Sequence, residues 1–292
     1  MSIKLDLYRI FCTVAQCNSF SKAAKELYMT QPAVSQAIAQ LETELDIRLF
    51  TRTPRGVTLT KEGQMLFEYS NSAINLINTA EQKLLETKNL LAGELRIGVG
   101  DTISKHYLLP YLEKFHNQFP SIKFKIMNGT TPELCAMLKS GELDLSICNL
   151  PISDGSIEIR ECLTIHDIFV CGKGFLTNNS MPLSLSQVAE LPLILLEHKS
   201  NSRRYIENYF LSKGIKLIAE IELGSHDLLL ELAKINLGVA CVIKEFSKDY
   251  LEKSLLYEVK LKEEIPARSI GVCFLKNVSL SPTSMKFIEI IK

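Results

Sequence analysis

The sequence has no excess of charge of either sign, because 33 Lys and Arg balance 33 Asp and Glu among 292 residues. This balance argues against a protein that coats nucleic acid non-specifically, although it permits a local basic patch. The N-terminus has no apolar signal core, and no apolar run reaches the length of a bilayer span. We therefore expect a cytoplasmic protein of two or three domains with no membrane partner.

The usual motifs of catalysis and metal binding are also missing. The eight cysteines form no Cys-x-x-Cys pair, and no histidine spacing completes a zinc site. Gly98-Val-Gly100 lacks the further glycine and acidic partner of a dinucleotide fingerprint. With no nucleophile triad or carboxylate pair, we expect no metal, no cofactor and no enzyme activity. Buried free thiols are expected for the cysteines, with a redox-sensing pair as the alternative.

Residues 21–42 predict two short helices joined by a tight turn, an arrangement that can place the second helix in the DNA major groove. Thr30 can cap the second helix, and Pro32 is tolerated in its first turn. An ordinary packing corner is the alternative interpretation of this segment. Apolar residues recur at helical spacing on both sides of the turn: Phe20, Ala24, Leu27, Val34, Ile38, Leu41 and Leu45. An earlier helix would bury Leu7, Ile10, Phe11 and Val14.

A basic segment follows the two helices. Residues 46–60 have β-prone residues around a Pro54-Arg-Gly turn, which predicts a two-stranded wing. Between residues 47 and 61 there are four cations and no acid. Arg52 and Arg55 of the wing would hold the DNA backbone, since phosphate contacts need only charge near the strand.

Gln31, Ser35 and Gln36 fall at the start of the second helix, away from its apolar stripe. Glutamine can form a bidentate contact with adenine, so these side chains would contact base edges or nearby phosphates. The expected partner is double-stranded promoter DNA. The complete set of DNA-binding candidates is Ser21, Thr30, Gln31, Pro32, Ser35, Gln36, Arg52 and Arg55.

A long helix is predicted over residues 61–91, where no Gly or Pro follows Gly63. Its apolar residues form a narrow stripe typical of a helix that pairs with another helix, which would make a homodimer able to read two half-sites. An amphipathic helix packed on its own domain is the alternative. The stripe comprises Leu66, Tyr69, Ala73, Leu76, Ile77, Ala80 and Leu84.

Beyond Ala92-Gly93 the sequence alternates between strands and helices, which predicts parallel sheets in two α/β lobes with a cleft between them. The domains are residues 1–60, 61–91 and 92–292. The first lobe comprises about 92–162 and 268–292, and the second about 163–267. Strands are predicted at 95–99, 122–127, 143–148, 169–171, 193–196, 216–223, 239–243 and 270–275. Helices are predicted at 104–118, 132–139, 202–212, 228–235 and 282–291.

The chain resembles the LysR-type transcriptional regulators. The matching residues are Phe11, Ser19, Phe20, Ala23, Ala24, Leu27, Gln31, Pro32, Ala33, Val34, Ser35, Ile38, Leu41, Glu42, Leu45, Leu49, Phe50, Arg52, Leu59, Thr60 and Gly63. A looser likeness continues through Leu95-Arg-Ile-Gly-Val, Leu109-Pro110, Phe119-Pro120, Gly141-Glu-Leu-Asp-Leu and Asn236-Leu-Gly238-Val. The resemblance implies a bacterial regulator with an N-terminal winged helix-turn-helix, a dimerising linker helix and a two-lobed sensing domain like periplasmic binding proteins. It also implies a homotetramer that binds promoter DNA, responds to a small effector, and has RNA polymerase as a further partner.

The strand ends of the two lobes are the expected effector site, because unpaired amides at helix starts favour a carboxylate or similar anion. The resemblance assigns Thr102 and Ser104 to this site, since pockets of the family use small hydroxylated residues there. We expect a small polar or anionic effector. The candidates are Thr102, Ser104, Thr130, Thr131, Asn149, Ser200, Asn201, Ser225 and His226, all of which could instead be helix caps.

Two positions depart from the family pattern: Gln36 stands where many relatives have Arg, and Asn236 where they usually have Gly. Two other functions would suit the α/β lobes. One is a solute-binding protein, and the other is a metabolic protein whose N-terminal unit serves only dimerisation. DNA binding by the first sixty residues distinguishes the regulator from both.

Overall fold

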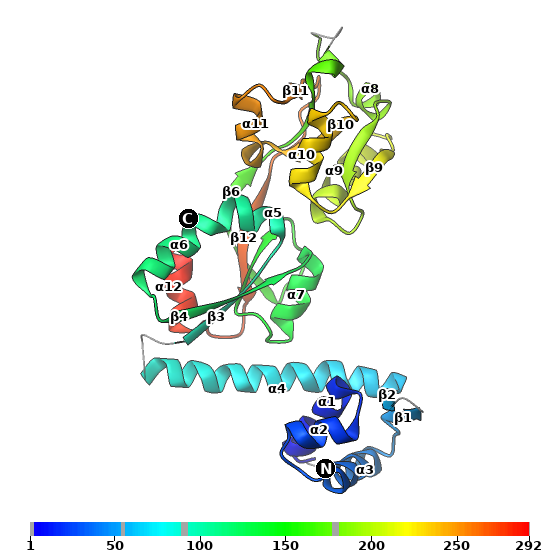
Figure 1. The fold of residues 1–292 in the computed structure, drawn as a ribbon, viewed down its shortest axis with the longest axis vertical. Coiled ribbons are helices and arrows are strands. Elements are labelled where there is room, and N and C mark those ends of the chain that lie inside the picture. The colour runs from blue at the N-terminus through cyan, green and yellow to red at the C-terminus, as the bar shows by residue number, and fades with distance from the viewer. Residues whose placement is uncertain (1–2, 54–55, 89–92, 177–180, 292) are drawn as a thin grey trace. The chain divides into compact units, whose positions relative to one another are not determined.

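A computed structural model of the chain describes residues 3–53, 56–88, 93–176 and 181–291 (Figure 1). The chain forms two compact units, residues 1–85 with 139–142, and residues 86–138 with 143–292. Among the described residues, no helix has both the length and the apolar character needed to cross a membrane.

The N-terminal unit begins with three helices, α1 (Leu5–Cys17), α2 (Phe20–Glu26) and α3 (Gln31–Leu45). They bury the predicted apolar faces, and Phe11, Val34 and Leu41 are fully inaccessible to solvent. The hydroxyl of Thr30 accepts a hydrogen bond from the N–H of Ala33, so the predicted cap of α3 is confirmed.

The predicted wing is an antiparallel pair of strands, β1 (Phe50–Thr53) and β2 (Gly56–Leu59). Glu42 on α3 fixes where it begins, because its carboxylate accepts from the N–H groups of Leu49 (2.7 Å) and Phe50 (3.2 Å). At Gly56 the φ angle is +136°, and a Cβ there would lie 2.5 Å from the Asn18 carbonyl oxygen. Only glycine fits this close approach, so the wing is held against the α1–α2 turn.

Helix α4 spans Lys61–Lys88. One part of the apolar stripe predicted on α4 packs on its own domain, and another part is exposed. Leu66 packs into the core of the N-terminal unit, whereas Tyr69 and Leu84 are 76% and 69% exposed. Met65, which is 59% exposed, extends this open apolar face. Residues 89–91 of the predicted helix lie outside the described residues.

The first lobe of the C-terminal unit contains a five-stranded sheet in the order β4-β3-β5-β12-β6. Strand β3 is parallel to β4 and β5, as the predicted βαβαβ unit requires, while β12 is antiparallel to β5 and β6. The last strand of the chain therefore returns to the first lobe, as predicted. The strands are β3 (Gly93–Val99), β4 (Ile122–Asn128), β5 (Leu145–Asn149), β6 (Ile157–Ile165) and β12 (Arg268–Leu275).

The second lobe has a sheet in the order β11-β7-β10-β8-β9. The chain enters this lobe after Ile165 and leaves it before Arg268, so the two lobes are joined by two strand connections. The strands are β7 (Asp167–Cys171), β8 (Leu193–Leu196), β9 (Ala219–Leu223), β10 (Val239–Ile243) and β11 (Tyr257–Val259).

Helices cover both sheets. In the first lobe α6 and α12 lie side by side (Figure 1). The rings of Phe115 and Phe287 pack edge to face, with 5.1 Å between their centroids. The first-lobe helices are α5 (Asp101–Ile103), the π-helical turn η1 (Ser104–Leu108), α6 (Leu109–Gln118), α7 (Thr131–Lys139) and α12 (Pro282–Ile290). Those of the second lobe are η2 (Lys173–Leu176), α8 (Leu185–Ala189), α9 (Asn201–Ser212), α10 (His226–Lys234), η3 (Lys244–Phe246) and α11 (Lys248–Glu252).

Three sequence predictions need correction. Strand β6 was not predicted, and because it continues to Ile165 the first crossing between the lobes comes later than residue 162. The helix predicted from Ser104 begins at Asp101 and passes through a π turn. The short elements α8, α11 and β11 were also missed, since each is five residues or fewer and has too little periodicity to detect.

Gly63 provides a test of the packing between α4 and the wing. A Cβ at this position would lie 2.1 Å from the Leu49 carbonyl oxygen. Gly63→Ala should therefore lower the free energy of unfolding by about 1–3 kcal/mol, although alanine normally stabilises a helix. Gly155→Ala is the control, because nothing lies within 4 Å of its Cβ position. Urea unfolding followed by circular dichroism measures both, and equal stability of the two variants would contradict the packing argument.

Candidate functional site

The start of α3 presents a polar surface to solvent. Gln31, Pro32 and Gln36 are exposed and Ser35 is half-buried, while Val34 of the same turn is buried in the core. Helical spacing therefore places the predicted base-reading side chains opposite the packed face of the helix. Ser21 and Thr30 are also exposed, so none of the DNA-binding candidates whose side chains are described is fully buried.

The described charges near this surface are mainly positive. Lys22 and Lys25 on α2 and Arg48 before the wing are exposed. The first ten residues of α3 contain no acidic side chain. The backbone of Arg52 lies in β1 opposite Val57, but its side chain and the whole of Arg55 fall outside the described residues.

Tyr28 is a surface residue that sequence reasoning missed. It lies in the turn before α3, is 98% exposed, and has a φ angle of +54°. A bulky residue rarely adopts this left-handed conformation, which costs roughly 1 kcal/mol. The detectable signal was an aromatic side chain two residues before a helix cap, where turn residues are usually small or polar.

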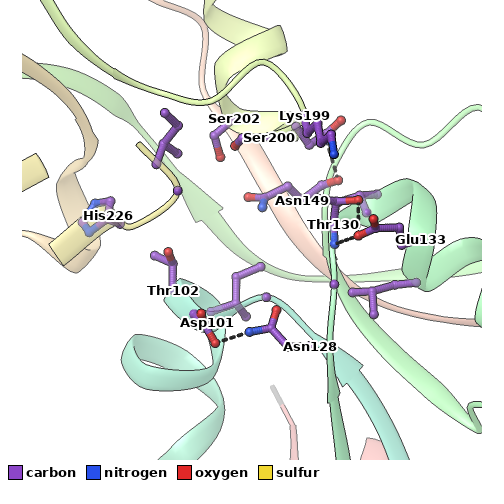
Figure 2. Close-up of a pocket in the computed structure, with 18 of the residues that line it drawn as sticks. Asp101, Thr102, Asn128, Thr130, Glu133, Asn149, Lys199, Ser200, Ser202 and His226 are labelled. Atoms are coloured by element: carbon purple, nitrogen blue, oxygen red, sulfur yellow. Dashed lines mark hydrogen bonds between the residues drawn. The ribbon is translucent and has the colours of Figure 1, made fainter. Parts of the chain in front are cut away.

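A cavity of about 370 Å³ lies in the C-terminal unit and is lined from both lobes (Figure 2). Of the nine predicted effector residues, seven line it: Thr102, Thr130, Thr131, Asn149, Ser200, Asn201 and His226. Sequence reasoning missed other polar residues of the lining, notably Asn128, Glu133, Glu197, Lys199 and Ser202.

Ser104 and Ser225 do not line this cavity. Ser225 is the N-cap of α10, where its hydroxyl accepts from the Leu228 N–H. Ser104 lies inside the helical segment, and its N–H donates to the Gly100 carbonyl oxygen. At Ser225 the capping alternative is therefore the one the structure shows.

Three helices of eight or more residues begin at the cavity wall: α7 at Thr131, α9 at Asn201 and α10 at His226. The first-turn N–H groups of a helix have no partner within the helix, and the helix dipole makes this end partly positive. The arrangement can therefore bind acceptor oxygens from three sides.

The charged side chains of the lining are mixed. Asp101, Glu133 and Glu197 are acidic and Lys199 is basic. The N–H and the hydroxyl of Thr130 both donate to Glu133 at 2.8 Å, and these hydrogen bonds lower the pKa of its carboxyl group. Asn128 donates to Asp101 in the same region (Figure 2). Two of the three acids are thus already engaged by neighbouring donors.

Arg268 connects the lobes beneath the cavity. Its guanidinium forms a bidentate ion pair with Asp167 at the start of β7, with Nε–Oδ2 and Nη2–Oδ1 distances of 2.5 and 2.8 Å. Nη1 also donates to Asn149 Oδ1 (2.7 Å), and Nη2 donates to the hydroxyl of Ser202 (2.9 Å). Both Arg268 and Asp167 are 5% exposed. A buried arginine therefore fixes one cavity residue from each lobe.

His226 begins α10 and is only 2% exposed. Its Nε2 accepts a hydrogen bond from the N–H of Ile243 on β10 (3.1 Å). Burial lowers the pKa of His226 to about 4, with a smaller contribution from His106, so the ring is neutral at pH 7.

His106, His226 and Asp227 lie close enough together to resemble a metal site. Several of their ligand atoms already have partners, however. Asp227 accepts from Lys105 Nζ at 2.8 Å and lies 3.0 Å from His106 Nε2, while His226 Nε2 faces a backbone N–H. The geometry favours an ion pair between η1 and α10 over a cation site.

The cysteines are free thiols, and five of the eight are buried, as expected for small core residues. Burial raises the pKa of Cys12 and Cys171. At Cys148 a hydrogen bond with Cys135 lowers the pKa, but the Cys273 thiol and burial outweigh it and raise the value to about 12. Thiols with raised pKa are poor nucleophiles, which disfavours the alternative of a redox-sensing pair.

Comparison with known families accounts for both units. Residues 5–64 match the model described as "Bacterial regulatory helix-turn-helix protein, lysR family", and residues 88–292 match "LysR substrate binding domain". The chain belongs to the LysR family of regulators. It is a DNA-binding transcriptional regulator and not an enzyme.

Curated proteins that match most of this chain are transcriptional regulators. The HTH-type transcriptional activator CmpR of Synechocystis is 26% identical over 236 residues, which cover 81% of this chain and 77% of that protein. The RuBisCO operon transcriptional regulator of Allochromatium vinosum is 26% identical over 292 residues, covering 100% and 96%. Both domains of this chain thus have counterparts in single relatives.

Solved structures share the fold. A full-length OxyR from Pseudomonas aeruginosa matches with a TM-score of 0.72 at 20% identity, covering 100% of this chain and 94% of that one. Full-length CbnR in complex with its target DNA matches with a TM-score of 0.67 at 17% identity, covering 99% of each chain. The expected winged helix-turn-helix, linker helix and two-lobed α/β domain are therefore confirmed.

The buried ion pair beneath the cavity gives a stability prediction. Arg268→Met leaves the Asp167 carboxylate buried without its cation, which should lower the free energy of unfolding by about 3–5 kcal/mol. Adding Asp167→Leu should restore most of the loss, because neither charge then remains. Lys286→Ala, which removes an exposed pair with Glu289, should change stability by less than about 0.5 kcal/mol. Calorimetric unfolding measures all three, and a double variant as unstable as the sum of its single changes would contradict this account.

The lowered pKa of His226 gives a pH prediction. The folded protein holds this ring neutral down to about pH 4, whereas the unfolded value is 6.5, so the unfolded state binds more protons between these values. The contribution of the neutral His226 ring to the free energy of unfolding is therefore fully present above pH 6.5. It decreases as the pH falls, by about 2 kcal/mol between pH 7 and pH 5. His226→Gln should remove this part of the pH dependence, whereas the exposed control His116→Gln should not. Parallel stability curves for wild type and His226→Gln would disprove the assignment.

Proposed function

We propose that this regulator changes its binding to promoter DNA when a small polar effector, carrying an anionic group, occupies the cavity between the two lobes. The observation that supports this most directly is that seven predicted residues from separate segments meet in one cavity of about 370 Å³. A cavity of this size and with this polar lining suits a small metabolite.

The effector's anionic group would lie against the starts of α7, α9 and α10, because residues of these helix starts line the cavity and the positive end of a helix dipole favours an anion. A structural neighbour is a ligand complex of a domain with this fold. The regulatory domain of Synechocystis CcmR, in complex with 2-PG, matches with a TM-score of 0.62 at 18% identity, covering 68% of this chain and 95% of that one. We take from it only that a regulatory domain of this fold can bind a small ligand.

On DNA, the exposed start of α3 would enter the major groove, with Gln31, Ser35 and Gln36 reading base edges. Arg52 and Arg55 of the wing would bind the backbone. We add Tyr28 to this surface, because its exposed phenol stands beside the start of the same helix.

The open apolar face of α4, formed by Met65, Tyr69 and Leu84, would pair with the same helix of a second copy. The dimer would present two recognition helices, and two dimers would form the expected homotetramer. We place this assembly in the cytoplasm, with RNA polymerase as a further partner at the promoter.

DNA binding can be tested with DNA from immediately upstream of the protein's own gene. Gln31→Ala should weaken binding to this DNA by roughly 1–3 kcal/mol while leaving the affinity for random DNA unchanged. Arg55→Ala should weaken both, and should reduce the slope of log affinity against log salt by about 1. Fluorescence anisotropy at two salt concentrations distinguishes the two effects.

Gln64→Ala is the matched control for the glutamine, because Gln64 is exposed on α4 outside the predicted surface. It should bind both DNAs like wild type. Equal losses for Gln31→Ala on promoter and random DNA would refute base reading by Gln31. A complete lack of promoter binding, with any effector, would refute the proposed function.

A further inference from the structure

The turn after α7, residues 139–142, packs within the N-terminal unit, although the residues before and after it belong to the C-terminal unit. Its glycine begins the segment Gly141-Glu-Leu-Asp-Leu, which is part of the likeness to the LysR family. The cavity and the DNA-binding surface described above give this segment no role. Its contacts with α4 therefore call for a separate explanation.

Gly141 lies directly against the backbone of α4. Its φ angle is +73°, and a Cβ there would lie 3.1 Å from the backbone nitrogen of Leu76 and 3.2 Å from the carbonyl carbon of Asn75. The hydroxyl of Thr79, a residue only 5% exposed, donates to the Gly141 carbonyl oxygen at 3.4 Å. Both the conformation and the close approach favour glycine. We call these interactions with Asn75, Leu76 and Thr79 the Gly141 contact.

The residues that follow the turn attach it to β3. The carboxylate of Asp144 accepts from Nη2 and Nε of Arg96 at 2.8 and 3.1 Å, and from the Arg96 backbone N–H at 2.9 Å. Leu143 packs over Gly98, where a Cβ would lie 2.3 Å from Leu143 Cδ1. Arg96 and Gly98 both lie in β3. The turn is therefore held by the first lobe on one side and contacts α4 on the other.

Helix α7 leads from the cavity to this turn. Thr130 and Thr131, at its start, line the cavity, and its last residue is Lys139. Nine residues of helix span about 13 Å at 1.5 Å per residue. Leu134 and Leu138 are 1% and 0% exposed, so the helix is closely packed along its length. A short, closely packed helix passes a shift at one end to the other instead of absorbing it.

We propose that α7 and the turn at residues 139–142 connect the effector cavity to α4 through the Gly141 contact. This inference rests on the proposed function, because it names how occupancy of the same cavity reaches the helix that follows the DNA-binding wing. A ligand bound against the start of α7 would move this helix, and the turn would move with it. Coupling requires two arrangements of different stability, which here are Gly141 in contact with α4 and Gly141 released from it.

Two glycines separate the contact from the backbone conformation. Gly141 and Gly214 have φ angles of +73° and +75°, so alanine is strained at both positions. Among the described residues, nothing lies within 4 Å of a Cβ at Gly214, whereas α4 lies against Gly141. Gly141→Ala should therefore break the contact, and Gly214→Ala is its matched control. Thr79→Val is a second variant that changes only the α4 side and leaves the turn intact.

A substitution at the cavity end of α7 can take the place of a ligand, so the effector need not be known. Glu133→Ala removes the acceptor of two hydrogen bonds, from the N–H and the hydroxyl of Thr130. It should loosen the start of α7 where it lines the cavity. Glu113→Ala is the control, because Glu113 is an exposed acid on α6.

The experiment is hydrogen exchange, measured by mass spectrometry on the full-length protein without DNA or ligand. Amides of residues 75–83 should exchange at least about threefold faster than in wild type when Gly141→Ala, Thr79→Val or Glu133→Ala is introduced. The two controls should leave this segment unchanged. Adding Glu133→Ala to Gly141→Ala should give no further acceleration, because the connection to α4 is already lost.

Equal acceleration in Gly141→Ala and Gly214→Ala would overturn the role of the contact. The proposal also fails when Glu133→Ala leaves residues 75–83 unchanged, or when its effect multiplies with that of Gly141→Ala. If Gly141→Ala does not fold, the same comparison is made between Thr79→Val and Glu133→Ala. A cavity ligand that leaves promoter binding unchanged refutes the proposed function instead, because the exchange measurement contains neither ligand nor DNA.

Discussion

The two lobes of the C-terminal unit depend on one buried ion pair, between Arg268 and Asp167. Each residue stands at the first position of a strand, where the chain passes from one lobe to the other. The remaining guanidinium donors are directed at Asn149 and Ser202, which line the cavity from the first and second lobes. Because the fork of an arginine is planar and rigid, the spacing of these two cavity walls is set by its geometry. Any ligand between the lobes is therefore bound against a fixed base.

In the N-terminal unit, a few contacts likewise hold the polar surface in place. Glu42 anchors the wing to α3, while Gly56 and Asn18 hold the wing against the preceding helices. These contacts fix the basic segment relative to the helix that would read bases. Tyr28 has its left-handed backbone in the turn between α2 and α3, and its exposed phenol lies on the surface proposed to bind DNA.

Sequence patterns predicted most of the fold, because most elements bury a periodic apolar face. The helix cap at Thr30 and the strand over residues 239–243 match the structure at their stated positions. Strand β6 was missed although its sequence alternates, since it lies at the sheet edge and pairs only with β12, about a hundred residues later. Asn236, which replaces the usual glycine of the family, has a φ angle of +63°, a conformation that asparagine tolerates better than most residues.

The sequence predicted where the cavity lies, but it did not predict the hydrogen bonds, ion pair and charged residues found there. Hydroxyl and amide residues at strand ends indicated a binding site, but the same residue types cap helices, as Ser225 does. Neither the Arg268 ion pair nor the hydrogen bond between Ile243 and His226 could be predicted, because each depends on a partner distant in the sequence and on burial. Lys199 and Glu133 were missed for a different reason, since isolated charges carry no periodic signal.

The central claim is that occupancy of the cavity changes how the N-terminal unit binds DNA. The most direct measurement is the affinity and footprint of the full-length protein on its promoter, with and without a small carboxylate or phosphate ester that raises its melting temperature. We predict that such a ligand shifts the dissociation constant or the protected region. A ligand that binds in the cavity but leaves both affinity and footprint unchanged would contradict the account.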